Sequence, residues 1–244
     1  MKLKIINPNT TQSMTDKIGQ CARAVAAPAT RISAVSPRMG PASIESHYDE
    51  ALSVPGVLEE ILAGERDGVD AYVIACFGDP GLHAARELAR GPVLGIAEAA
   101  MHAASLIGSS FSVVTTLART CNMAWHLAER YGMKRFCRNV HACDLSVLEL
   151  ERPGSDARRI IAERCRLALA QDRSECIVLG CAGMADLCEE ITDIIGAPVI
   201  DGVTAAVKMT EALVSIRLGT SKRGDWARPL PKPYAGMLAP FSLG

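Results

Sequence analysis

Short apolar runs alternate with longer amphipathic stretches along almost the whole chain. Runs rich in valine, isoleucine and leucine, typical of buried strands, occur at residues 3–6, 31–35, 71–75, 93–96, 111–115, 139–143, 176–179 and 199–200. Stretches with helical periodicity include residues 11–27, 53–67, 81–90, 119–131, 156–171 and 184–195. Strands that alternate with helices predict parallel sheets covered by helices, and continuous apolar strands fit sheets that are buried on both faces.

One pattern of residues occurs twice in the chain, in the segments VIACFGDPGL and VLGCAGMADL. In each segment a cysteine (Cys76, Cys181) follows a short apolar run, and a glycine (Gly78, Gly183) stands two residues later. A leucine stands six residues after each cysteine (Leu82, Leu187). A Pro-Val pair begins 16 residues after Cys76 and 17 residues after Cys181. The shared features predict an internal duplication and therefore two lobes of similar structure.

We therefore expect an α/β protein with two pseudo-symmetric lobes, each a mainly parallel sheet flanked by helices. Residues 1–98 and 205–244 are assigned to the first lobe, which is discontinuous and includes a C-terminal arm, and residues 99–204 to the second. The arm, from residue 220 onward, is rich in proline and glycine, which predicts an extended segment packed on the surface or on another subunit.

The position of the active site follows from the direction of the strands. Open parallel sheets bind ligands outside the carboxyl ends of their strands. Four polar or thiol-bearing segments fall at such ends: residues 7–10, Cys76, residues 115–116 and Cys181. We expect them to converge on a cleft between the two lobes.

Composition restricts the classes of partner. With 26 basic and 27 acidic residues the formal net charge is −1, so no basic field attracts nucleic acid or an anionic membrane. No apolar run approaches the roughly 18–20 residues that span a bilayer, and the N-terminus does not resemble a signal peptide. Nine cysteines, an odd number without a C-x-x-C motif, indicate free thiols in a reducing cytoplasm.

Two thiols at matching turns provide an acid and a base for proton transfer at carbon. A thiol has a reference pKa of ~8.5, and we expect the helix N-terminus after each cysteine to lower it. A thiolate on one side removes a proton next to a carbonyl, and the thiol on the other side protonates the opposite face. The chain has no G-x-G-x-x-G after a strand, Walker loop or H-E-x-x-H spacing, so we expect neither cofactor nor metal.

The cysteine segments also resemble a known family. Together with INPNT, SVPG and VVTTLAR they are similar to the hydantoin and allantoin racemases of the aspartate/glutamate racemase superfamily, and the similarity extends from Lys4 to about Ser221. The resemblance implies cofactor-independent racemisation with Cys76 and Cys181 as catalytic residues. The residues that it implies for substrate binding are Asn9, Gly78, Asp79, Thr116 and Gly183. Superfamily members that decarboxylate malonates keep a single catalytic cysteine, so two cysteines favour racemisation.

The resemblance implies a 5-substituted hydantoin as the substrate. We also expect the enzyme to be a homo-oligomer. The ring presents carbonyl and N–H edges, which suit neutral donors and acceptors such as Asn9 and the threonines. The four segments expected at the cleft contain no obvious basic residue to hold a free carboxylate. Allantoin racemase is the nearest alternative, because allantoin is itself a 5-substituted hydantoin. There are two further alternatives. One is an aspartate/glutamate-type amino-acid racemase, and the other is a non-catalytic ligand-binding or thiol-redox protein.

Three acidic residues have two interpretations each. Asp79 either orients a ligand N–H group or caps the helix that begins after Pro80. Glu45 and Asp49 either line the mouth of the cleft or lie in a solvated loop, and we favour the loop.

Overall fold

The computed structural model describes residues 1–243 and contains two four-stranded sheets, in which every strand pair is parallel. The first sheet has the order β2-β1-β3-β4 and the second the order β6-β5-β7-β8, so both halves use the same arrangement. The strands are β1 (Lys2–Ile6), β2 (Arg31–Val35), β3 (Ala71–Ile74), β4 (Val93–Gly95), β5 (Phe111–Thr115), β6 (Cys137–Ala142), β7 (Cys176–Leu179) and β8 (Val199–Ile200). The predicted α/β fold class is confirmed.

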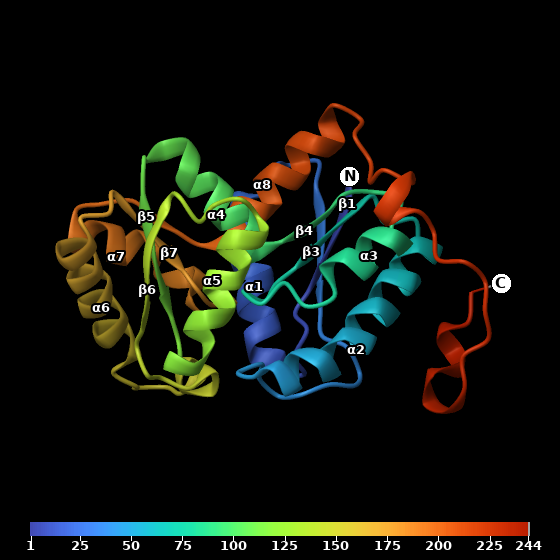
Figure 1. Ribbon diagram of the computed structural model, residues 1–244, viewed down its shortest axis with the longest axis horizontal. Coiled ribbons are helices and arrows are strands. Elements are labelled where there is room, and N and C mark those ends of the chain that lie inside the picture. The colour runs from blue at the N-terminus through green and yellow to red at the C-terminus, as the bar shows by residue number, and fades with distance from the viewer. Residues whose placement is uncertain (244) are drawn as a thin grey trace.

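Eight α-helices in the described residues cover these sheets (Figure 1). They are α1 (Gln12–Val25), α2 (His47–Arg66), α3 (Leu82–Leu88), α4 (Ile96–Ile107), α5 (Cys121–Arg130), α6 (Ala157–Asp172), α7 (Cys188–Ile195) and α8 (Gly202–Ser215). In Figure 1, α2 and α3 lie on the outer side of the first sheet and α6 and α7 on that of the second, while α1, α4 and α5 lie towards the middle. None of the described helices is long and apolar enough to cross a membrane.

Helix α4 contributes to the hydrophobic cores of both halves. Ala99 packs in the cluster of the first sheet with Val73, whereas Met101 packs in the cluster of the second sheet with Val113. Helix α8 then returns to the first sheet and packs against α1, α4 and β3. The predicted lobe boundary after residue 98 falls inside α4, and it stays a prediction.

Two helices, α2 and α7, begin more than two residues away from their predicted starts. Helix α2 starts at His47 rather than at residue 53, because the Ser46 hydroxyl accepts a hydrogen bond from the Asp49 N–H group (3.1 Å) and caps the helix. The stretch predicted as a helix from residue 184 begins as a 3₁₀ turn, η3 (Ala182–Leu187), and becomes α-helical only in α7. Asp49 therefore lies in a helix and not in the solvated loop.

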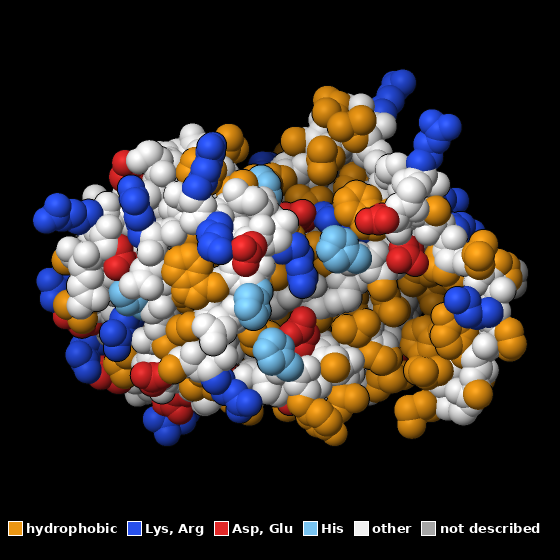
Figure 2. All heavy atoms as spheres, viewed as in Figure 1, with side chains coloured by type: hydrophobic (Ala, Val, Ile, Leu, Met, Phe, Trp, Pro, Cys, Tyr) orange, Lys and Arg blue, Asp and Glu red, His pale blue; other side chains and the backbone are white. Residues whose placement is uncertain are grey.

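The C-terminal arm packs on its own chain. The Thr220 hydroxyl donates to the Gly91 carbonyl (2.6 Å), and the Trp226 ring stacks on His83 of α3. Beyond Trp226, Leu230 and Tyr234 border an apolar groove that α2 and α3 complete. Figure 2 shows hydrophobic side chains gathered on this part of the surface, whereas Lys and Arg are spread over the second sheet and its helices. The arm thus packs on the chain's own surface through these contacts.

Candidate active site

The two repeated cysteines line one cavity at the carboxyl ends of the central strands. Cys76 follows β3 and Cys181 follows β7, each separated from its strand by one residue. The space that the cavity encloses together with its opening to solvent is about 590 Å³. The structure thus brings together the two turns that the sequence pattern paired. The other lining residues are Asn9, Met14, Ile44, Ala75, Phe77, Gly78, Thr115, Thr116, Thr120, Met123, Ala124, Val147, Gly180 and Ala182.

A glycine accompanies each thiol, as predicted. A Cβ atom added at Gly78 would lie 3.9 Å from the Cys76 Sγ atom, and one at Gly183 would lie 3.6 Å from the Cys181 Sγ atom. Gly78 lines the cavity, whereas Gly183 lies beside the Cys181 thiol but outside the lining. The absence of side chains at both positions keeps the space next to each sulfur open.

Burial and backbone hydrogen bonds act on the thiols in opposite directions. Burial raises the pKa of Cys76 to about 12 and the pKa of Cys181 to about 11. Hydrogen bonds from the backbone N–H groups of Gly78 and Gly183 lower these pKa values, as the sequence predicted for the turns. Desolvation of the buried thiols nevertheless outweighs the backbone amides, so the net direction of both pKa shifts is upward. At neutral pH both thiols are mostly protonated.

The side chain of Asn9, in the turn after β1, is held by two hydrogen bonds to its oxygen, while its NH₂ group faces only the sulfur of Met14. Its Oδ1 atom accepts hydrogen bonds from the Asn7 side-chain amide (2.9 Å) and from the Thr11 N–H group (3.0 Å). Its Nδ2 atom approaches the Met14 Sδ atom at 3.2 Å, and a thioether is only a weak acceptor. The Asn9 side chain is thus fixed in place with an N–H group available to a ligand.

The two threonines at the end of β5, Thr115 and Thr116, differ in their hydrogen bonding. The Thr115 hydroxyl donates to the Gly180 carbonyl (3.3 Å) and shares a hydrogen bond with the Thr120 hydroxyl (3.1 Å). The Thr116 hydroxyl has no hydrogen-bond partner among residues 1–243, although Thr116 is buried and lines the cavity. Thr115 therefore supports the site, and Thr116 offers a hydroxyl to a ligand.

Asp79 lies outside the cavity lining and is fully engaged elsewhere. Its carboxylate accepts hydrogen bonds from the backbone N–H groups of Ala97 (3.1 Å) and Glu98 (3.0 Å) and from the Tyr131 hydroxyl (2.7 Å). Asp79 thus caps a helix, but that helix is α4 and not the predicted one after Pro80. Burial raises the pKa of Asp79 to about 7, although these three hydrogen bonds favour the charged form.

Apolar side chains that no motif identified form much of the cavity wall. Met14, Ile44, Phe77, Met123 and Val147 come from segments far apart in the sequence, and each is an ordinary hydrophobic residue in its local pattern. No local signal separates them from core residues, so only the tertiary structure shows their position. All the residues that line the cavity are uncharged.

Glu45 links the two halves beside this cavity. Its Oε1 atom accepts a hydrogen bond from the Val147 N–H group at 2.6 Å. Lys17 and Glu151 form a second link between the halves, an ion pair with an N–O distance of 2.8 Å. The interpretation of Glu45 as part of a solvated loop is therefore wrong, because this carboxylate crosses between the loop before α2 and the segment after β6.

Comparison with known proteins places the chain in a family. Residues 3–210 match the Asp/Glu/Hydantoin racemase family. The chain belongs to this family. Its relatives include the hydantoin racemase of Rhizobium meliloti, 52% identical over 97% of this chain and 98% of the relative. The hydantoin racemase of Pseudomonas sp. (strain NS671) is 48% identical over 99% of this chain and 97% of the relative.

A solved member of the racemase family has nearly the same structure. The allantoin racemase from Klebsiella pneumoniae is 54% identical and superposes with a TM-score of 0.97, covering 99% of both chains. The resemblance that the cysteine segments indicated is thus confirmed. In this racemase-family chain, the two similar cysteine turns border a single cavity lined by neutral side chains.

Proposed function

We propose that the protein is a cofactor-independent racemase of 5-substituted hydantoins, in which Cys76 and Cys181 exchange a proton with opposite faces of the ring α-carbon. The observation that carries the proposal is that both cysteines of the repeat border one uncharged cavity. Identities of 48% and 52% to proteins named hydantoin racemase, over almost the whole chain, support the choice of substrate.

The proposed reaction moves one proton off carbon and another onto it. One cysteine, as the thiolate, removes the α-proton, and the electron pair of the C–H bond passes into the adjacent carbonyl to give a planar enolate. The other thiol then gives its proton to the opposite face of the α-carbon. The product is the mirror image of the substrate, and the two cysteines have exchanged their protonation states.

Neutral donors around the cavity suit the enolate and the ring. The Asn9 amide and the Thr116 hydroxyl can donate to ring oxygens, and the backbone N–H groups of Gly78 and Gly183 stabilise negative charge on the sulfurs. Burial raises the pKa of both thiols, so each thiolate is a stronger base towards a weakly acidic C–H group.

Allantoin racemisation is the second candidate. The 54% identity to the allantoin racemase from Klebsiella pneumoniae favours it. The apolar side chains of Met14, Ile44, Phe77 and Met123 in the cavity wall favour an apolar 5-substituent instead, because a polar ureido group requires hydrogen-bond partners. The uncharged lining disfavours a free amino acid as substrate, since its carboxylate and ammonium groups would be unpaired.

Polarimetry with single enantiomers tests the proposal. Benzyl- and isobutyl-substituted hydantoins are expected to lose optical rotation with the enzyme, while free aspartate and glutamate keep theirs. Activity confined to the ureido-substituted compound would identify an allantoin racemase. Activity on free amino acids alone would identify an amino-acid racemase, and binding without loss of rotation would indicate a non-catalytic protein.

We also propose that the enzyme is a homo-oligomer in the cytoplasm. All nine cysteines are unpaired, which suits a reducing compartment. Leu106 and Ile107 at the end of α4, and Ile216 and Leu218 after α8, are exposed apolar side chains that a second copy would shield from water. Sedimentation velocity at micromolar concentration tests this, and a single monomeric species would contradict it.

A further inference from the structure

We infer that Asp79 is a positioning residue for Cys76, which holds the cysteine turn against the N-terminus of α4 and against Tyr131. The inference rests on the proposed racemase function and adds a residue to it that does not border the cavity.

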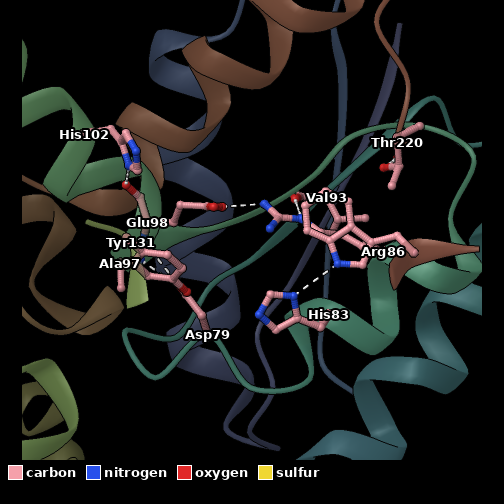
Figure 3. Close-up of polar contacts among 11 residues, drawn as sticks. Asp79, His83, Arg86, Val93, Ala97, Glu98, His102, Tyr131 and Thr220 are labelled. Carbon is pink, nitrogen blue, oxygen red and sulfur yellow. Dashed lines mark hydrogen bonds and ion pairs between the residues drawn. The ribbon is translucent and has the colours of Figure 1, made fainter. Parts of the chain in front are cut away.

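Asp79 closes the turn that carries the cysteine. Its backbone N–H group donates to the Cys76 carbonyl (2.9 Å), and its φ angle of +46° is in the left-handed region that few residues other than glycine adopt. Its side chain is 2% exposed and meets three donors, two from the first turn of α4 and one from Tyr131 after α5. Figure 3 shows the Asp79 carboxylate and the Tyr131 ring pointing towards each other beside Ala97 and Glu98. The turn is thus fixed at both its backbone and its side chain.

The second half of the chain caps the corresponding helix in a different way. Asp201 precedes α8, with φ −93° and ψ 148°, and its own carboxylate accepts the Thr204 N–H group at 2.9 Å. Gly95 precedes α4 in nearly the same conformation, with φ −88° and ψ 147°, but has no side chain. A Cβ atom at Gly95 would lie 2.1 Å from the Asp79 Cγ atom. The carboxylate that caps α4 therefore comes from the cysteine turn, and it occupies the space that a side chain at position 95 would need.

The turn that carries Cys181 has no such anchor. Met184 stands in the position that corresponds to Asp79, and it is fully buried in a hydrophobic cluster with Ile161 and Leu179. The two cysteine turns, similar in sequence, are thus held by a polar anchor in one half and by apolar packing in the other. A change at Asp79 should therefore disturb Cys76 and leave Cys181 in place.

Substitution of Asp79 by asparagine keeps the shape of the side chain but not its acceptors. Asparagine has one acceptor oxygen, and its amide group is a donor that would face another donor from Ala97, Glu98 or Tyr131. The turn is then expected to shift, together with the Gly78 N–H group and the Cys76 thiol that it carries. Misplacement of a reacting group by about 1 Å can lower a rate by about a hundredfold.

Deuterium exchange in two single-cysteine backgrounds tests the inference. Asp79→Asn is combined with Cys181→Ser, which leaves Cys76 as the one cysteine of the pair. It is also combined with Cys76→Ser, which leaves Cys181. Wash-in of deuterium at the α-carbon of each hydantoin enantiomer is followed by NMR. We expect a loss of about tenfold or more with Cys76 alone and a change within about twofold with Cys181 alone. Equal losses in both backgrounds, with folding intact, would overturn the inference.

Two controls separate positioning from helix capping. Asp201→Ala removes the corresponding cap from α8, so it should lower the Tm without changing the ratio of the exchange rates by Cys76 and by Cys181. The double substitution D79A/G95D moves the capping carboxylate to the place that Asp201 has before α8, so it should restore the Tm but not exchange by Cys76. Recovery of both the Tm and the exchange rate by Cys76 in D79A/G95D would show that Asp79 only caps the helix. If Asp79→Asn fails to fold, Tyr131→Phe, which removes a single donor, should give the same one-sided loss at smaller magnitude.

An assay without substrate distinguishes failure of this inference from failure of the proposed function. If the wild-type protein exchanges no hydantoin proton, the proposed function is contradicted. The rates of iodoacetamide alkylation at Cys76 and Cys181, measured by peptide mass spectrometry, still report on the two turns. Asp79→Asn should change the rate at Cys76 alone, and unchanged rates at both cysteines would overturn the inference.

Discussion

The two proposed catalytic thiols combine strong basicity with a small thiolate population. Burial raises the pKa of Cys76 to about 12 and that of Cys181 to about 11, against the lowering effect of the glycine N–H groups beside them. A thiolate of high pKa is better matched to a weak carbon acid. It is also a minor species at neutral pH, because the raised pKa favours the protonated thiol.

The first prediction concerns the pH dependence of thiol reactivity without substrate. Only the thiolate is alkylated, and a raised pKa means that the thiolate fraction grows as pH rises towards that pKa. Rates of iodoacetamide modification at Cys76 and Cys181 should therefore increase about tenfold per pH unit between about pH 7 and 9, without levelling off. Peptide mass spectrometry measures both rates, and added hydantoin should protect both sites. A plateau below about pH 8 would show that the thiols are ionised more easily than their burial predicts.

The second prediction concerns Thr115 and Thr116 at the end of β5. Thr116→Val removes a hydroxyl without a partner among the described residues, so kcat/KM should fall about tenfold, as for one lost hydrogen bond to a developing charge, with the free energy of unfolding changed by less than about 0.5 kcal/mol. Thr115→Val is the matched control. It removes the hydrogen bonds to Gly180 and Thr120, so it should lower the free energy of unfolding by about 1 kcal/mol. Wild-type kcat/KM in Thr116→Val would exclude this hydroxyl from substrate binding.

The sequence predicted those residues of the site that belong to the repeat or that follow a strand. Cys76, Cys181 and Gly78 stand out through the repeat, and Asn9 and Thr116 through their position after strands; the structure places all five at one cavity. Asp79 was not predictable in its observed role, because its partners Ala97 and Tyr131 come from other helices. Residue type and spacing around Cys76 contain no information about those contacts.

Strands and helix starts differ in how far the sequence determines them. The strands matched within one or two residues because most of them are short, mainly apolar runs between polar segments. The start of α2 was missed, although Ser46 and Asp49 form the S-x-x-D signal of a helix N-terminus. The extent of η3 before α7 could not be read from the sequence, because residues 182–187 have the composition of a helix and their geometry depends on packing of the turn after Cys181.

The third prediction tests the cap of α2. Ser46→Ala should lower the free energy of unfolding by about 1 kcal/mol, because the Asp49 N–H group loses its acceptor. Ser46→Asp should retain most of the stability, because aspartate also caps helix N-termini. Urea denaturation measures both variants. Equal stability of the alanine variant and the wild type would show that the first turn of α2 is held by packing alone.

At the scale of the whole molecule, the two halves share one sheet arrangement but are linked by contacts that have no counterpart in the repeat. Both sheets have the same strand order, and the two cysteine turns line one cavity where the central strands end. The two-lobed α/β fold was predictable from the repeat. The links between the halves were not, because Glu45 with Val147 and Lys17 with Glu151 join segments about a hundred residues or more apart without a shared motif. Helix α8 packs on α1, α4 and β3, and the assignment of residues 205–244 to the first lobe stays a prediction.

The most direct test of the two-cysteine account is the racemisation rate of Cys76→Ala and Cys181→Ala from each pure hydantoin enantiomer. Each substitution removes the base for one direction and the acid for the other, so polarimetry should show losses of about 10²–10⁴-fold in both directions. The Tm should stay close to that of the wild type, which circular dichroism checks. A single alanine variant that racemises either enantiomer at nearly the wild-type rate would contradict the account.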